Sequence, residues 1–155
     1  MYAADRAEHV DALIRPALER GAVVVTDRYV DSSLAYQGRG RNLPLAEIAG
    51  LNQWATGGLR PDLTILLDLS PVAGLVRRAP SADRLEAEPA EFHQRVREGF
   101  LAQARQDPGR YLVLDATRPP DQISREIRDR IRDMLPDPVP AVAEHDTGSF
   151  PAIID

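Results

Sequence analysis

The stretch that decides the fold runs from Ala22 to Arg41 and reads AVVVTDRYVDSSLAYQGRGR. Its β-branched run, Val23 to Thr26, is short and apolar, which predicts a strand covered on both faces. Polar side chains begin where that strand would end, and open parallel sheets bind their ligands at the carboxyl ends of strands. The stretch therefore predicts a nucleotide site, with Asp27 and Arg28 projecting from the end of the strand.

Apolar residues recur at helical or strand spacing on both sides of this stretch. The pattern predicts helices over Ala3–Arg20, Tyr29–Gln37, Leu45–Thr56 and Pro119–Leu135, a short helix from Pro71, a long helix through Phe92 and Phe100, and strands over Leu63–Leu69 and Tyr111–Leu114. Residues 38–44, GRGRNLP, are expected to be a glycine-rich connector. This alternation of helices and strands is typical of an α/β fold with a parallel sheet.

The composition limits the number of domains and the partners. A chain of 155 residues, 43% of them hydrophobic, predicts one globular domain, over residues 1–135. Residues 136–155 contain four prolines and no periodicity, which predicts a disordered tail or linker. The apolar runs are too short to cross a bilayer and no leader pattern is visible, so we expect a cytoplasmic protein. A net charge of −5 argues against nucleic acid as a partner.

All 19 residues that carry a basic Lys or Arg side chain are arginine, and the sequence contains no lysine. A Walker A loop uses glycine-rich backbone and a lysine to hold phosphates, so these residues contain no complete motif of that kind. The base composition of the genome also accounts for such an arginine bias. The bias alone therefore identifies no function.

Five segments of the chain have the order and spacing of one known family. They are YAADRAEHVDALIRPALERG at the start, TDRYVDSSLAYQGRGR, LRPDLTILLDLSP, DRLE and LDATRPP. Over nearly all of residues 1–135 the sequence resembles thymidylate kinase. The resemblance implies a P-loop nucleoside-monophosphate-kinase fold, an α/β fold in which helices flank a parallel sheet. Family members carry a first strand, a phosphate-binding loop, a helix and a second strand before the part that matches Met1. We therefore expect an incomplete fold, the C-terminal portion of the domain without its first, central strand and its second strand.

The resemblance implies an enzyme that transfers the γ-phosphoryl group of ATP to dTMP, giving dTDP, with Mg²⁺. Its expected partners are dTMP and ATP, with a homodimer once the domain is complete and with neither nucleic acid nor membrane. The family's central strand lies between the strands that match Val23–Thr26 and Leu63–Leu69, so we expect this chain to fold poorly and to be inactive alone. The alternative is a non-catalytic module that binds a thymidine nucleotide or a protein partner.

The residues themselves support an acceptor site. Tyr2 and Arg6 are four apart and share a helix face, where the ring can stack on a base and the guanidinium can donate to the O4 of thymine. Cytosine has a donor amino group there and would be disfavoured. A buried Tyr2 and a solvated Arg6 are the structural alternative. The resemblance assigns dTMP binding to Tyr2, Arg6, Arg28, Ser33, Tyr36 and Gln37, with Arg28 on the phosphate and Tyr36 against the 2′ side of the sugar.

The remaining candidates belong to catalysis and to ATP. Asp27 is assigned to Mg²⁺ and the phosphates, although an aspartate after a strand is also a common helix cap. The resemblance implies that Arg77, Arg78 and Arg84 lie in a lid that closes over the triphosphate, and that Arg78, Arg84, Thr117 and Arg118 bind ATP. A solvated charged loop is the alternative for the lid. Since the acceptor is an ionised phosphate oxygen, no strong general base is required. Trp54, His93, Phe92 and Phe100 are interpreted as packing or surface residues.

Overall fold

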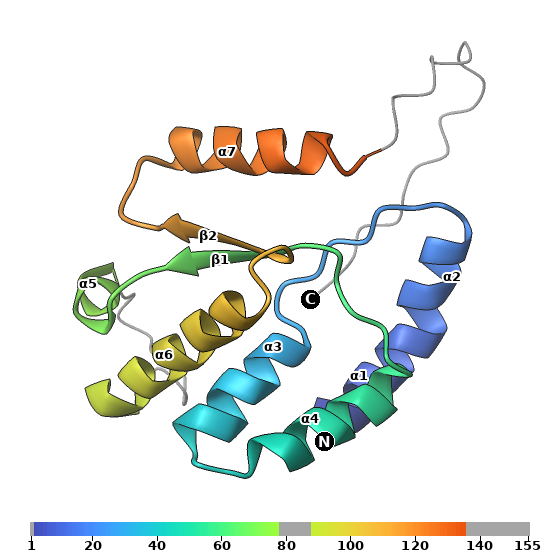
Figure 1. Cartoon of the computed structure of the whole chain (residues 1–155), viewed down its shortest axis with the longest axis horizontal. Coiled ribbons are helices and arrows are strands. Elements are labelled where there is room, and N and C mark those ends of the chain that lie inside the picture. Colours follow the sequence, from blue (N-terminus) through green and yellow to red (C-terminus); the bar gives the residue numbers. More distant parts are fainter. Residues whose placement is uncertain (1, 78–87, 136–155) are drawn as a thin grey trace.

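The structure is a computed structural model that describes residues 2–77 and 88–135. Its first elements form one long helical segment. Helix α1 (Tyr2–His9) continues through a π-helical turn, η1 (Val10–Ile14), into α2 (Arg15–Glu19) (Figure 1). Val10 and Ile14 are buried, as the helical spacing of apolar residues predicts. Gly21, with a φ of 78°, ends the segment in a left-handed conformation that glycine adopts without steric cost. The helix expected over Ala3–Arg20 is confirmed.

The strand expected over Val23–Thr26 is wrong. Residues 22–26 form no strand, and the side chain of Val25 is 90% exposed. An extended segment becomes a strand only when a neighbour pairs with its N–H and C=O groups. The described sheet contains β1 (Thr64–Asp68) and β2 (Tyr111–Asp115) alone, and neither pairs with this segment.

After this segment the chain forms three helical elements that contain most of the candidate acceptor residues. Helix α3 (Val30–Ser33) leads into a second π-helical stretch, η2 (Leu34–Gly40), and α4 (Leu45–Thr56) follows with the bounds that the sequence predicts. Because η2 ends at Gly40, it extends into residues 38–44, which were expected to be a glycine-rich connector. A Cβ on Gly40 would lie 2.7 Å from the Phe92 ring, so glycine allows η2 to approach the next layer closely.

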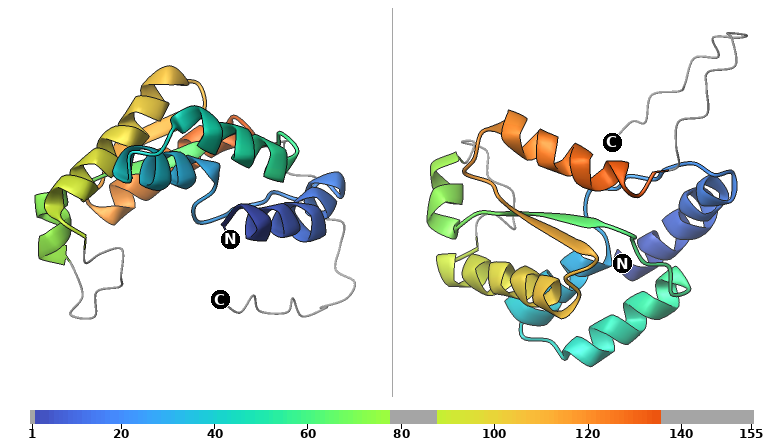
Figure 2. Two further views of the ribbon diagram at one scale, coloured as in Figure 1. Left: turned by 90° about the horizontal axis from the view of Figure 1, so that it is seen from below. Right: turned by 45° about the horizontal axis from the view of Figure 1, so that its top comes forward.

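The sheet has two parallel strands whose residues pair from Thr64 with Tyr111 to Asp68 with Asp115. Between them the chain forms α5 (Pro71–Arg77) and α6 (Ala90–Gln106), and α7 (Pro120–Arg132) follows β2. The two strands lie between α6 and α7 (Figures 1 and 2). This is the α/β arrangement with a small parallel sheet and flanking helices that the sequence predicts. Leu67 is 52% exposed, so β1 is less buried than its apolar run suggests.

The core lies between η2 and α6. Ala35, Phe92 and Val96 are buried together, and Tyr36 and Phe100 pack against them. These contacts show packing for both phenylalanines, which were predicted to be packing or surface residues. Trp54, in contrast, is 80% exposed on α4, in agreement with a surface role.

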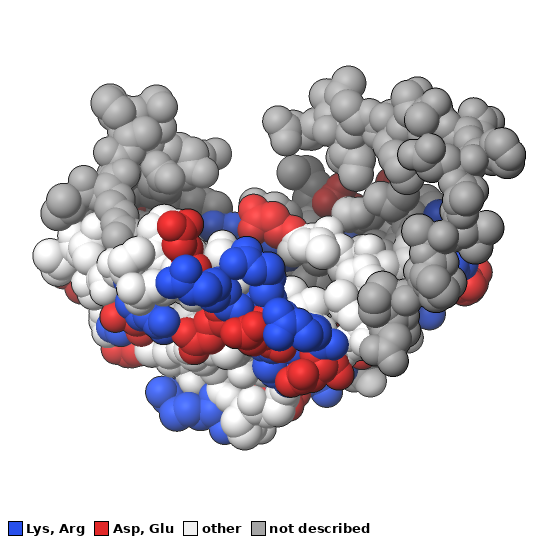
Figure 3. Space-filling model, turned by 90° about the horizontal axis from the view of Figure 1, so that it is seen from above, with Lys and Arg blue, Asp and Glu red and all other residues white. Residues whose placement is uncertain are grey.

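Helix α7 has an exposed face of mixed charge. Arg125, Arg128 and Asp129 are exposed there, and arginine and acidic side chains alternate over the side of the molecule seen from above (Figure 3). Interspersed charges of both signs are typical of a solvated helix face. Among the described residues, no helix is long and apolar enough to cross a membrane.

Candidate functional site

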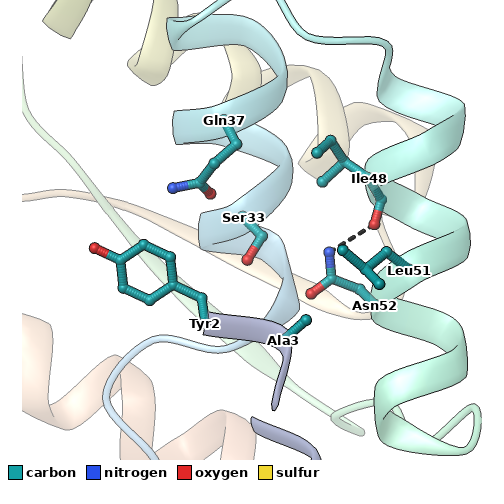
Figure 4. A pocket seen from close by; sticks show the side chains of 7 residues that line it. All are labelled: Tyr2, Ala3, Ser33, Gln37, Ile48, Leu51 and Asn52. Carbon is teal, nitrogen blue, oxygen red and sulfur yellow. Dashed lines mark hydrogen bonds between the residues drawn. The ribbon is translucent and has the colours of Figure 1, made fainter. Parts of the chain in front are cut away.

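A pocket of about 150 Å³ lies between α1, α3, η2 and α4 (Figure 4). Its lining residues are Tyr2, Ala3, Ser33, Gln37, Ile48, Leu51 and Asn52. The first two come from α1, the next two come from α3 and η2 within the stretch Ala22 to Arg41, and the last three come from α4. Three of the predicted acceptor residues, Tyr2, Ser33 and Gln37, therefore line one cavity, although they are up to 35 positions apart in the sequence.

Arg6 lies beside this pocket and is held by two oxygen atoms. Its Nη1 donates a hydrogen bond to Oδ1 of Asn52, and its Nη2 donates to the carbonyl oxygen of Tyr29 at 3.4 Å. The guanidinium carbon is 5.7 Å from the centroid of the Tyr29 ring, within the range of a cation–π contact. Burial lowers the pKa of Arg6, while the charged form is favoured by Tyr29 and Asp5. Arg6 is thus a partly desolvated donor at the edge of the cavity.

Asn52 is a residue of this site that the sequence analysis missed. Its side chain lines the pocket and the residue is only 5% exposed. Nδ2 donates to the carbonyl oxygen of Ile48, one turn earlier in α4, at 2.6 Å (Figure 4). The available signal was an amide on the same helix face as Ile48 and Thr56, where an apolar residue would be expected.

Arg28 and Tyr36 form a second contact, outside the lining of the pocket. Arg28 has a φ of 63°, in the left-handed region that is uncommon for any residue with a Cβ. Thr26 donates to its carbonyl oxygen at 3.3 Å. The exposed guanidinium lies 5.2 Å from the centroid of the Tyr36 ring, and that ring packs on Phe92 at 6.1 Å. The turn therefore directs Arg28 toward the helix that carries Ser33 and Gln37.

The predicted metal ligand, Asp27, is exposed next to this turn. Within residues 2–77 and 88–135, no three His, Asp or Glu side chains gather as a metal cluster would require. Mg²⁺ keeps several water ligands and is often bound through one or two carboxylates together with substrate phosphates. A single accessible carboxylate is compatible with that mode of binding. It does not form a metal site from protein groups alone.

The carboxyl edge of the sheet brings Asp68 and Asp115 side by side. Asp115 accepts hydrogen bonds from the backbone N–H of Thr117 at 2.8 Å and from its hydroxyl at 2.7 Å. Arg118 pairs with Glu126 of α7 at 2.8 Å. Two of the four residues predicted to bind ATP, Thr117 and Arg118, therefore lie directly after β2, and both have protein partners in this structure.

Asp68 is held by a two-pronged ion pair across the sheet edge. Arg97 Nε donates to Oδ1 at 2.7 Å and Nη2 donates to Oδ2 at 2.8 Å. The hydrogen bond from Arg97 lowers the pKa of Asp68 below its ordinary value of 3.8, against the opposing effect of burial. This pair joins β1 to α6.

We expect this pair to stabilise the fold in a pH-dependent way. Because the pKa of Asp68 is lower in the folded state, the stabilisation is present above about pH 4 and is lost as the pH falls through the folded value. We expect the free energy of unfolding to be higher for the native chain than for Asp68→Asn at pH 6. This difference, measured by urea unfolding, should shrink as the pH falls to 2. Arg97→Gln should give the same narrowing, and a difference that stays constant over this range would contradict the prediction.

Three predicted lid residues remain without a described side-chain position. Arg77 is the last residue of α5, and the structure describes only its backbone. Arg78 and Arg84 lie outside the described residues, as does the predicted tail of residues 136–155.

A buried ionic network fastens α3 to the sheet, and its central residue was also missed by the sequence analysis. Asp31 is 5% exposed and accepts hydrogen bonds from Arg110 at 3.0 and 3.2 Å and from the Tyr111 hydroxyl at 2.6 Å. Thr64 also donates to this carboxylate at 3.3 Å. Burial would lower the pKa of Arg110, but the hydrogen bonds and charge of Asp31 raise it. The pKa of Tyr111 is raised by burial and by its bond to Asp31. Arg110 and Tyr111 therefore both keep their protons near neutral pH.

Comparison with known proteins assigns these residues to one sequence family. The family model described as thymidylate kinase matches residues 1–127. The chain is 54% identical over 138 residues to a thymidylate kinase of Clavibacter michiganensis, an alignment that covers 87% of this chain and 65% of the relative. It is 50% identical over 137 residues to one of Symbiobacterium thermophilum, covering 88% and 64%, respectively. For a relative in Deinococcus radiodurans the identity is 54% over 129 residues, covering 82% and 63%. The chain thus spans 63 to 65% of the length of these relatives.

Proposed function

Because the chain belongs to the thymidylate kinase family, we propose that it provides the acceptor half of an enzyme that transfers the γ-phosphoryl group of ATP to dTMP, giving dTDP. One observation carries this proposal. Tyr2, Ser33 and Gln37 line a single pocket, and Arg6 is hydrogen-bonded to a fourth lining residue, Asn52. A cavity with a few convergent polar groups and apolar walls is the usual form of a small-molecule site.

In the proposed complex the thymine base lies between Tyr2 and the polar groups of the pocket. The ring of Tyr2 is 62% exposed, which leaves its face accessible for stacking. Arg6 donates to O4 of thymine, where the amino group of cytosine would meet a donor. Ser33 and Gln37 supply hydroxyl and amide groups for the other polar atoms of the nucleoside, and Tyr36 limits the space on the 2′ side of the sugar.

The proposed phosphate site is the turn at Asp27 and Arg28. The guanidinium of Arg28 is exposed, and a guanidinium can bind two oxygens of a phosphate at once. Asp27 is proposed to hold Mg²⁺ through its carboxylate or through bound water. The metal, when bound, neutralises charge on the phosphates during transfer.

We propose that the donor phosphates are held by groups outside these 155 residues. The chain contains no lysine, so a complete Walker A loop is not among them. Arg77, Arg78 and Arg84 are proposed as lid residues that meet the triphosphate, and Thr117 and Arg118 as residues near the adenine. The chain alone is then expected to bind dTMP without transferring phosphate to it. Assembly of the complete domain as a homodimer stays a prediction.

Replacing Arg28 by alanine should weaken the binding of dTMP by about 10- to 150-fold, because hydrogen bonds to charged groups contribute roughly 1.5–3 kcal/mol. Binding of thymidine, which has no phosphate, should change little. Titration calorimetry of both ligands measures the two effects. Arg125→Ala, an arginine on the exposed face of α7, is the matched control and should bind dTMP as the native chain does.

The same preparations test the function itself. If the native chain binds no dTMP, the proposed acceptor site is wrong, and equal losses for dTMP and thymidine in Arg28→Ala would place Arg28 outside the phosphate site. Incubation with ATP, Mg²⁺ and dTMP should give no dTDP. Turnover by the 155-residue chain comparable to that of an intact family member would overturn the proposed division of the active site. Binding of dTMP without turnover in a chain joined to a Walker A segment of a family member would favour the non-catalytic module.

A further inference from the structure

We propose that Asn52 is the positioning residue that fixes Arg6 at the base end of the pocket and thereby sets a preference for thymine over cytosine. This inference rests on the proposed function and adds to it a determinant of base specificity on α4. Asn52 is supplied by a helix that contains none of the acceptor residues predicted from the sequence. Its role follows from the hydrogen bonds on the two sides of its amide group.

The orientation of the Asn52 amide is fixed by its neighbours. Nδ2 donates to the carbonyl oxygen of Ile48 at 2.6 Å, and an amide nitrogen is the only end of this group that can donate. The acceptor Oδ1 consequently faces Arg6, whose Nη1 donates to it. The reversed amide would set an oxygen against the carbonyl of Ile48 and N–H groups against a guanidinium that can only donate. One orientation therefore satisfies both partners.

Arg6 is held by this amide together with the carbonyl of Tyr29. Each of its two terminal nitrogens makes one of these bonds, and a guanidinium has five N–H donors. Its other N–H groups belong to a guanidinium that is bonded directly to Asn52, a residue that lines the cavity. A free arginine side chain samples many rotamers, so these bonds reduce the entropy that Arg6 loses when a ligand binds.

Fixing the guanidinium is what makes it selective. A mobile arginine could turn into solvent when cytosine occupies the pocket, and the mismatch would then cost little. An arginine held by Asn52 keeps its N–H groups directed at the amino group of cytosine, where two donors meet and neither is satisfied. Rejection of the wrong base thus requires the residue that restrains Arg6 as well as Arg6 itself.

The test compares two variants of nearly equal size in the full 155-residue chain. Asn52→Leu removes the acceptor, whereas Asn52→Asp loses the donor to the Ile48 carbonyl but keeps an oxygen that can accept from Arg6. We expect the ratio of dTMP to dCMP affinity to fall about tenfold in Asn52→Leu and to be retained in Asn52→Asp, as measured by calorimetry. Gln53→Leu makes the same amide-to-leucine change on the exposed face of α4 and should leave the ratio unchanged.

A second readout needs no nucleotide. The guanidinium NMR signals of Arg6 should show restricted rotation in the native chain and in Asn52→Asp, and free rotation in Asn52→Leu. If thermal melting shows that Asn52→Leu does not fold, Asn52→Ala, which removes the amide without adding bulk, provides the same comparison.

The outcomes separate this inference from the proposed function. Absence of dTMP binding by the native chain would contradict the proposed function and with it the base preference, whereas the NMR result would still decide whether Asn52 restrains Arg6. Normal dTMP binding with an unchanged dTMP to dCMP ratio in Asn52→Leu would overturn the inference alone. An equal weakening of both nucleotides would show a merely structural role and would also overturn it.

Discussion

Replacing Asp31 by alanine is expected to lower the free energy of unfolding by roughly 3–5 kcal/mol, because the substitution removes the buried partner of the Arg110 charge. The Asp31 side chain is 7% exposed and that of Arg110 is 12% exposed. The same carboxylate accepts the hydroxyl of Tyr111, which would lose this acceptor. Urea unfolding followed by circular dichroism measures the change.

Asp107→Ala is the matched control for this prediction. Asp107 also pairs with Arg110, at 3.1 Å, but its side chain is 40% exposed, and ion pairs of exposed groups contribute roughly 0–1 kcal/mol. The free energy of unfolding should therefore fall several times less in Asp107→Ala than in Asp31→Ala. Equal losses in the two variants would mean that burial does not determine the strength of this network.

Replacing Phe92 by alanine should lower the free energy of unfolding by about 3–5 kcal/mol, the usual range for a buried aromatic residue. Phe92 is 4% exposed and fills the space between Tyr36 and Gly40. Because Tyr36 rests on this ring, the contact between Tyr36 and Arg28 should loosen as well. Chemical unfolding gives the stability, and the near-ultraviolet circular dichroism of the tyrosines reports the local change.

Trp54→Ala removes an even larger aromatic side chain and serves as the comparison. Trp54 is 80% exposed, so its removal should change the stability by no more than about 0.5 kcal/mol. A loss similar to that of Phe92→Ala would show that the α4 surface is covered in solution. Such a result would contradict the assignment of Trp54 as a surface residue.

Local patterns predicted most of the secondary structure. Leu45–Thr56 begins after a proline and ends before Gly57, which has a φ of 56°, and both signals are readable from the sequence. The spacing of apolar residues likewise predicted α6 and the two paired strands from local sequence alone. Each of these elements contains its own signal within a few residues.

The error at Val23–Thr26 has a different origin. Its composition satisfies the requirements of a strand, but pairing depends on a second segment that no local pattern identifies. Residues 22–26 form no strand, and the described residues supply no strand beside them. A sequence pattern can therefore indicate that a segment favours strand conformation, but it does not show whether another strand pairs with it.

The family resemblance selected candidate residues that the structure brings together, but it did not identify the contacts that hold them. Tyr2, Ser33 and Gln37 were identified, and they line one pocket. Asp31 and Asn52 were missed because each acts through a partner far along the chain, Arg110 and Arg6, respectively. Polar residues at buried helix positions were the available signal, but the partner could come only from the tertiary structure.

The left-handed backbone at Arg28 places opposing demands on one position. Glycine would relieve a conformational cost of roughly 1–2 kcal/mol, whereas the proposed phosphate contact needs a guanidinium. Evolution under selection for stability alone would replace this arginine, and selection for nucleotide binding would retain it. Under the proposed function, the arginine at position 28 favours nucleotide binding over the stability of the fold.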